Sequence, residues 1–203
     1  MEEKSARIIS WVLHPMLMPT YALLLILCQD AFFVLMLPSK LKLILTGLIV
    51  ANTLLLPLIF IWMMQKRGII SNYQMPERSE RTFPFATTAL FYFATWFMMN
   101  NLGLPAVYYM FVLGGAILIV IALAVNLFWK ISIHMIGIGG LTGGFTGLNY
   151  QMMISSTSLI LILILLSGLV GFSRLKQQTH SQSQVYVGFI VGVLVMSFVS
   201  FLL

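Results

Sequence analysis

The feature that most constrains this chain is a series of long apolar runs separated by short polar segments. An α-helix needs roughly 20 apolar residues to cross a bilayer, and seven runs reach or approach that length. A helix also satisfies its own backbone hydrogen bonds, which the bilayer interior requires. We therefore predict an all-α fold, a polytopic transmembrane helical bundle with six to seven spans. The runs cover residues 8–28, 42–64, 85–101, 105–128, 131–149, 151–172 and 185–203.

Composition supports a membrane protein without a soluble domain. Hydrophobic residues make up 60% of the 203 residues and charged residues only 8%, whereas soluble domains carry about 25% charge. No long polar stretch interrupts the runs, so residues 1–203 are predicted to form a single integral membrane domain. The first residues include Glu2 and Glu3 and lack the basic region of a signal peptide, so the first run is interpreted as a retained span. We expect a multi-pass protein of a bacterial cytoplasmic membrane.

The net charge of +6 does not indicate a nucleic-acid partner. The Lys and Arg residues occur singly or in pairs between apolar runs, where they mark loops and membrane interfaces. If every run crosses, only Lys40 and Lys42 lie on one face and the other basic residues share the opposite face. The positive-inside rule then places that basic face in the cytoplasm, although a basic site needed for chemistry would bias the same comparison. The residues of the basic face are Lys4, Arg7, Lys66, Arg67, Arg78, Arg81, Lys130, Arg174 and Lys176.

Metal and cofactor chemistry have few candidate residues here. The chain has one aspartate, Asp30, and one cysteine, Cys28, and two of its four glutamates lie at the N-terminus. A carboxylate-rich metal site, a cysteine-based site and a His-Glu-x-x-His zinc site are therefore excluded, and no cofactor is expected. The glycines between residues 137 and 147 lack a preceding strand and a following Gly-Lys-Ser/Thr. We interpret them as permitting close helix packing rather than as a phosphate loop.

Two of the three histidines, His134 and His180, lie on the basic face with hydroxyls and fixed cations nearby. This combination suits phosphoryl transfer without a metal. A neutral imidazole can attack phosphorus, a second can protonate the leaving oxygen, and Arg or Lys can hold the charge of the other oxygens. The imidazole pKa near 6.5 makes both protonation states accessible. The third histidine, His14, precedes Pro15 and is interpreted as a helix-packing or interface residue.

The strongest pattern begins at Ser173 and Arg174 and continues to His180. It resembles the SRxxxxxHxxxD motif of the type 2 phosphatidic acid phosphatase superfamily, except that Gln184 stands where the family has Asp. The family's PSGH motif is matched at Ser132 and His134, with isoleucine in place of Pro and Gly. The motifs follow the family order, and two predicted helices separate the second from the third, as in the family.

The family's first motif, KxxxxxxRP, is degenerate in this chain. If Arg81 is its arginine, the lysine position is Gln74, and the nearby proline is Pro84 rather than residue 82. Lys130 or Arg78 could replace the missing lysine charge. Alternative structural roles exist for both: Lys130 beside Trp129 is typical of an interfacial anchor, and Arg78 and Arg81 could pair with neighbouring glutamates on a solvated turn. The resemblance covers roughly residues 74–188, which makes about 74–203 the phosphatase-like core.

The resemblance implies a role for each matched residue. His180 would form a phospho-histidine intermediate and His134 would protonate the leaving alkoxide. Arg174, Ser132 and Arg81 would bind phosphate oxygens beside Ser173. Gln184 would orient the His180 ring without supplying charge; an acid-to-amide change in a catalytic triad cost about 10⁴ in rate. The implied substrate is a membrane lipid or polyprenyl phosphate.

Two functions therefore stay open at this stage. One is a metal-independent phosphatase of lipid-like phosphate monoesters or diphosphates. The other is a weak or inactive relative that binds or moves an anionic lipid, which the missing Asp and lysine favour. A small transporter is a weaker alternative, because the chain shows no inverted repeat and almost no charge within its runs.

Overall fold

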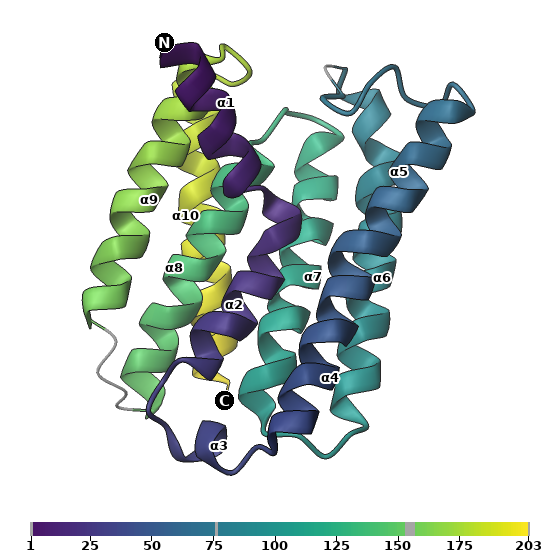
Figure 1. Cartoon of the computed structure of the whole chain (residues 1–203). Coiled ribbons are helices and arrows are strands. Elements are labelled where there is room, and N and C mark those ends of the chain that lie inside the picture. Colours follow the sequence, from purple (N-terminus) through teal and green to yellow (C-terminus); the bar gives the residue numbers. More distant parts are fainter. Residues whose placement is uncertain (1, 76, 153–156, 203) are drawn as a thin grey trace.

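A computed structural model describes residues 2–75, 77–152 and 157–202 of the chain. Every regular element in these residues is helical, which confirms the all-α prediction. The described helices form seven rods that stand side by side. The N-terminus lies at one end of the bundle and the C-terminus at the other (Figure 1). The polar segments that follow α5 (Leu56–Lys66), α7 (Ala106–Asn126) and α9 (Thr157–Lys176) lie at the N-terminal end. That arrangement gathers the predicted basic face at one end of the molecule.

The first predicted run, 8–28, is divided rather than continuous. Helix α1 (Glu2–Val12) ends before His14, a one-turn 3₁₀ helix η1 (Pro15–Leu17) follows, and α2 (Met18–Leu27) continues toward the other end. His14 has an extended backbone and its Nδ1 accepts a hydrogen bond from the Met16 amide, so it caps η1. Pro15 stands at the first position of η1, where proline is tolerated. Because proline has no backbone N–H, it could not continue α1 as a regular helix.

The second rod contains a stretch of π-helix that the sequence did not reveal. Helix α4 (Ser39–Ile49) leads into the π-helical η2 (Val50–Leu55) and then into α5. Pro57 lacks an amide hydrogen and its ring crowds the carbonyl of Thr53 four residues earlier. The wider π-helical turn accommodates both the missing hydrogen bond and the proline ring, as is usual for π-bulges. A short helix α3 (Phe32–Leu35) joins this rod to α2 at the far end.

Helix α8 (Ile133–Met152) lies at the centre of the bundle and packs closely along α10 (Gln182–Phe201). A Cβ on Gly139 would lie 2.5 Å from the Phe189 carbonyl oxygen, and one on Gly143 would lie 2.2 Å from the Val193 carbonyl oxygen. Any side chain at these positions would push the two backbones apart. The predicted role of the glycines in close helix packing is confirmed.

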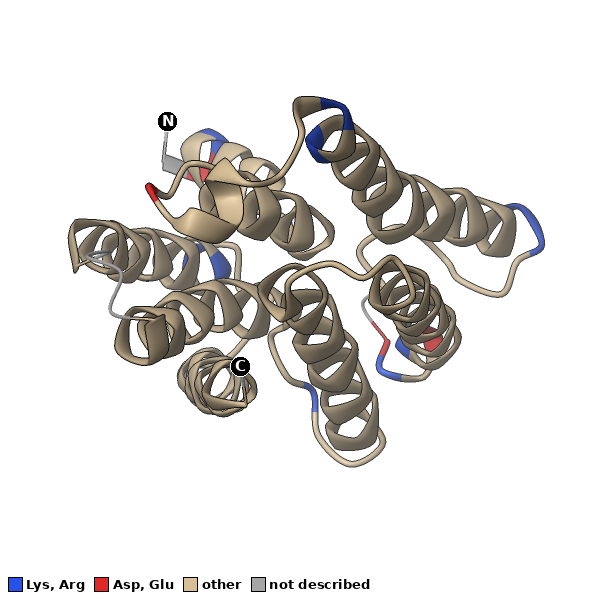
Figure 2. Ribbon diagram, turned by 90° about the horizontal axis from the view of Figure 1, so that it is seen from below, with Lys and Arg blue, Asp and Glu red and all other residues tan. Residues whose placement is uncertain are grey.

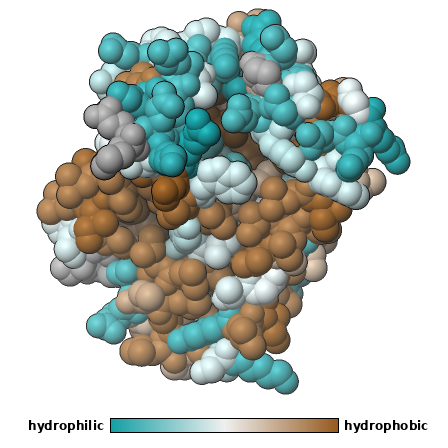
Figure 3. Space-filling view, turned by 45° about the horizontal axis from the view of Figure 1, so that its top comes forward, coloured by the Kyte–Doolittle hydropathy of each residue, from teal (hydrophilic) through white to brown (hydrophobic). Residues whose placement is uncertain are grey.

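Within the described residues, five helical segments are long and apolar enough to cross a membrane, and the 19-residue α6 (Thr82–Asn100) and the 20-residue α8 are not among them. Figure 3 shows a hydrophobic band across one face of the molecule, below a hydrophilic cap. Seen from below, most of the ribbon is free of charged residues (Figure 2). Most residues of α8 are buried. This explains the lower hydropathy of the helix, because a central helix contacts protein rather than lipid. The five spans are Glu3–Leu27, Ser39–Lys66, Ala106–Asn126, Thr157–Lys176 and Gln182–Phe201.

Candidate active site

A cavity of about 1390 Å³ opens at the polar end of the bundle and extends between the helices. Its polar end contains four cationic side chains and all three histidines. Of the lining residues that the structure describes, none is Asp or Glu. Such a surplus of positive charge near buried surface is typical of an anion site, because each cation needs a partner. The residues concerned are Arg7, Arg81, Lys130, Arg174, His14, His134 and His180.

The rest of the cavity is apolar. It runs from Arg81, directly before α6, along that helix to Tyr92, and a rise of 1.5 Å per residue makes this depth about 16 Å. Its inner wall includes Phe111, Leu141 and Met196, from α7, α8 and α10. The cavity therefore joins a cationic end to an apolar interior that reaches about half the thickness of a hydrocarbon core.

His180 lies in the turn between α9 and α10, and Gln184 in the first turn of α10 holds its ring. The distance from His180 Nδ1 to Gln184 Oε1 is 2.9 Å. The same amide oxygen accepts from the Ser181 amide at 3.3 Å, while the Ser181 hydroxyl caps α10. Because an amide oxygen only accepts, Nδ1 carries the proton and Nε2 keeps its lone pair. The capping box thus fixes the tautomer that a nucleophilic histidine needs.

Burial and the nearby cations Arg81, Lys130 and Arg174 together lower the pKa of His180 to about 4, against the opposing hydrogen bond to Gln184. The imidazole is therefore neutral at pH 7. Three cations close enough to affect one ring also show that this histidine faces the positive end of the cavity. A neutral ring beside fixed cations combines a nucleophile with groups that can bind phosphate oxygens.

Arg174 is buried, and α1 determines the position of its guanidinium group. Its Nη2 donates a hydrogen bond to the Ser10 hydroxyl, 164 positions away in the sequence. Gln177 Nε2 donates to the same hydroxyl at 2.9 Å, and Ser10 in turn donates to the Ala6 carbonyl at 3.0 Å. The Nε atom of Arg174 is buried without a hydrogen-bond partner. A buried donor without a partner is costly, so a bound anion would stabilise this arrangement.

His134 and His14 meet inside the cavity. Their ring centroids are 5.2 Å apart and the planes are nearly perpendicular, at 83°. His134 is buried at the start of α8, while His14 is half-buried at the break between α1 and η1. The two rings therefore come from rods that are far apart in the sequence.

Arg81 and Lys130 complete the cationic end from two further segments. Arg81, in the one-turn 3₁₀ helix η3 (Ser79–Arg81), is buried, and its Nε donates to the Met75 carbonyl at 2.9 Å. Burial lowers the pKa of Arg81, against the opposing charge of Glu80. Burial also lowers the pKa of Lys130, as does the charge of Arg81, whereas Glu77 raises it. Both shifts show partly desolvated cations whose charge is weakly screened.

Three residues predicted for phosphate binding do not line this cavity. Ser173 is fully buried, and its hydroxyl donates to the Ala6 carbonyl at 2.7 Å, so it joins α9 to α1. Ser132 is also fully buried and its hydroxyl has no hydrogen-bond partner. The Arg78 side chain is exposed, and the Arg78 backbone carbonyl accepts a hydrogen bond from the side-chain Nδ2 of Asn126 at 2.8 Å.

Sequence reasoning missed two residues of the site, His14 and Ser10. His14 was interpreted as a packing residue, although ionisable groups within apolar runs are functional by default. Applying that rule to His14 as to His134 would have found it. No local signal marked Ser10, because its role depends on the docking of α1 against α9.

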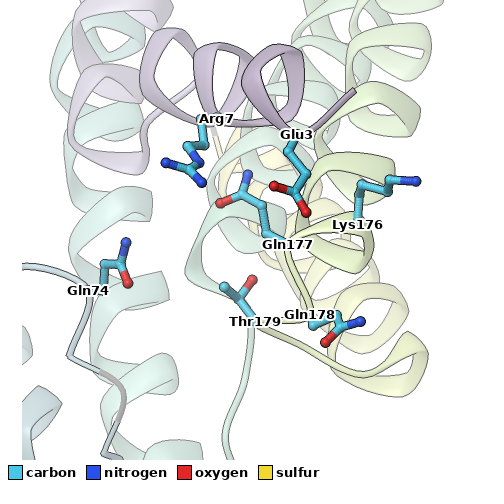
Figure 4. Close-up of a pocket in the computed structure, with 7 residues that line it drawn as sticks. All are labelled: Glu3, Arg7, Gln74, Lys176, Gln177, Gln178 and Thr179. Carbon is cyan, nitrogen blue, oxygen red and sulfur yellow. The ribbon is translucent and has the colours of Figure 1, made fainter. Parts of the chain in front are cut away.

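A smaller pocket of about 380 Å³ adjoins the mouth of the cavity (Figure 4). It shares five lining residues with the cavity, and Glu3 and Lys176 are its remaining walls. Figure 4 shows Arg7 and Gln177 between α1 and the end of α9, with Gln74 on the facing segment. The mouth is thus lined by amides, a hydroxyl and charged groups, in contrast to the apolar interior. The shared residues are Arg7, Gln74, Gln177, Gln178 and Thr179.

Comparisons with known proteins return no match among family models, curated proteins or solved structures.

Proposed function

We propose that this protein is a membrane phosphatase that hydrolyses lipid-like phosphate monoesters or diphosphates through a phospho-histidine intermediate on His180. The observation that carries the proposal is the position of His180. Its Nδ1 is bound by Gln184, and it stands among cations at the end of a largely apolar cavity. The cationic end suits a phosphate and the apolar part suits an acyl or prenyl chain. An amphiphilic phosphate matches both parts at once.

In the proposed reaction, His180 Nε2 attacks phosphorus and the bond from phosphorus to the lipid oxygen breaks. Protonated His134 gives its proton to that leaving oxygen. Water then attacks the phospho-histidine, His134 takes a proton from the water, and the phosphorus–nitrogen bond breaks. Arg174 and Arg81 stabilise the charge on the other phosphate oxygens, and Lys130 adds positive charge. No step requires a metal; the described residues contain no group of three His, Cys, Asp or Glu side chains suited to holding one.

The proposal also gives the substrate a route from the bilayer. The cavity lining includes the exposed side chains of Trp11 on α1 and of Ile59 and Trp62 on α5. Tryptophan is favoured at membrane interfaces. We propose that the lipid chain enters sideways between these two helices. In this arrangement α6 and α8 cross with the five apolar segments, because both run between the two ends of the bundle as their neighbours do (Figure 1).

The direct test is phosphate release by the purified protein in mild detergent with EDTA. The substrates are phosphatidic acid, phosphatidylglycerophosphate, a polyprenyl diphosphate and a lipid A phosphate. Release should persist in EDTA and disappear in His180→Ala. The matched control is Gln182→Ala, which changes an exposed residue in the same turn and should keep activity. A folded His180→Ala protein that still releases phosphate would refute the role of His180.

The second candidate function is binding or movement of an anionic lipid without turnover. The amide of Gln184 favours it, because this group orients His180 without supplying the negative charge that would best stabilise a positive ring. In the same assay, saturable binding of one of these lipids with no phosphate release would select this function.

A further inference from the structure

His14 is a histidine of the cavity that the proposed mechanism does not use. It lies within an apolar span, where an ionisable side chain is costly unless it has a function. Its ring lines the cationic end of the cavity beside His134 and Arg174. A packing role alone would be filled at lower cost by an apolar ring.

The backbone around His14 determines which ring nitrogen can donate. Nδ1 accepts the hydrogen bond from the Met16 amide at 3.3 Å, so this atom carries no proton. A neutral imidazole with an unprotonated Nδ1 has its proton on Nε2. The break between α1 and η1 thereby presents an uncharged N–H donor at this end of the cavity.

We propose that His14 is a phosphate ligand of this site, with its Nε2–H donating to a phosphate oxygen that Arg174 also binds. The inference rests on the proposed function for the nature of the ligand. The role differs from that of His134: His14 supplies a hydrogen bond in the ground state and the transition state and transfers no proton. Its edge-to-face contact also holds the His134 ring, which accounts for the perpendicular arrangement.

Three substitutions separate the functions that the His14 side chain combines. His14→Gln keeps an N–H donor at about the position of Nε2. His14→Asn keeps a cap for the Met16 amide but loses the distal donor. His14→Phe keeps an aromatic ring against His134 but has no donor and no cap. Leu13→Met, at the adjacent apolar residue that does not line the cavity, is the matched control.

The measurement is the Kd for inorganic phosphate by isothermal titration calorimetry in detergent, on variants whose thermal unfolding matches the unsubstituted protein. A hydrogen bond to a charged group is worth about tenfold in affinity. We expect His14→Asn and His14→Phe to raise Kd about tenfold, and His14→Gln and Leu13→Met to stay within roughly threefold. With a lipid phosphate substrate, the same two variants should raise KM more than they lower kcat.

Unchanged phosphate affinity in His14→Phe would overturn the inference in favour of ring packing, and unchanged affinity in His14→Asn would overturn it in favour of capping. Absence of phosphate binding by the unsubstituted protein would overturn it as well. Absence of turnover together with the expected changes in Kd would refute the phosphatase proposal and leave the ligand role of His14 intact.

Discussion

Gln184→Glu tests whether the amide at this position limits activity. Gln184 Oε1 lies 2.9 Å from His180 Nδ1, so the isosteric glutamate would place a carboxylate oxygen at the same point. Aspartate, which the family motif would suggest, is one methylene shorter and would fall short of the ring. Glutamate also preserves the capping box of α10, and a negative charge in the first turn of a helix is favourable.

The expected magnitude follows from the change in this one hydrogen bond. A neutral hydrogen bond contributes about 1 kcal/mol and one to a charged group about 1.5–3 kcal/mol, so the gain is roughly 0.5–2 kcal/mol, with a middle value of about 1.3, when the ring becomes positive. That corresponds to about a tenfold faster reaction and a rise of roughly one unit in the pKa of His180. The 10⁴-fold effect known for a catalytic triad is an upper limit, because Arg81, Lys130 and Arg174 offset part of the added negative charge.

The assay is initial-rate phosphate release in detergent, with Gln184→Asp and Gln184→Leu alongside. The expected order of activity is Glu above Asp, with Leu below the unsubstituted protein because it leaves Nδ1 without an acceptor. Unfolding temperatures should be measured for all three, since a better-capped helix changes stability independently of rate. A folded Gln184→Glu protein with no gain in rate would refute the reasoning that the missing charge limits turnover.

Three further predictions concern pH, the position of Arg174 and helix packing. Because the pKa of His180 is lowered from 6.5 to about 4, the stability that its neutral form contributes is fully present above pH 6.5 and is lost as the pH falls toward 4. An NMR titration of the His180 imidazole should give a midpoint near 4. A midpoint near 6.5 would contradict the burial of this ring. Ser10→Ala removes the acceptor for Arg174 and should cost about 1–3 kcal/mol of unfolding free energy and roughly tenfold in phosphate affinity, whereas Ser10→Thr should retain both. Gly143→Ala would force a Cβ to 2.2 Å from an α10 carbonyl oxygen and should lower the free energy of unfolding by about 1–3 kcal/mol, measured as a lower unfolding temperature. Gly168→Ala, where no atom lies within 4 Å of the added Cβ, is the control. Equal losses of stability in the two variants would contradict the packing argument.

The apolar runs of the sequence determine the class of fold and the end of the bundle at which the polar segments lie. Their lengths require helices, and the alternation of runs and polar segments places His134, Arg174 and His180 at one end. The local spacing of four residues from His180 to Gln184 also determines their hydrogen bond, because Gln184 lies in the first turn of α10 and His180 directly precedes Ser181, the N-cap residue of that helix.

Local spacing could not reveal the contacts between distant segments. The docking of α1 on α9 brings Ser10 to Arg174 and directs Ser173 toward the Ala6 carbonyl instead of the cavity. The same packing brings His14 against His134. Hydropathy shows that a segment is apolar but not which neighbour it meets or which way it is rotated. Only the tertiary structure decides which polar side chains face the cavity, because helix packing sets that rotation.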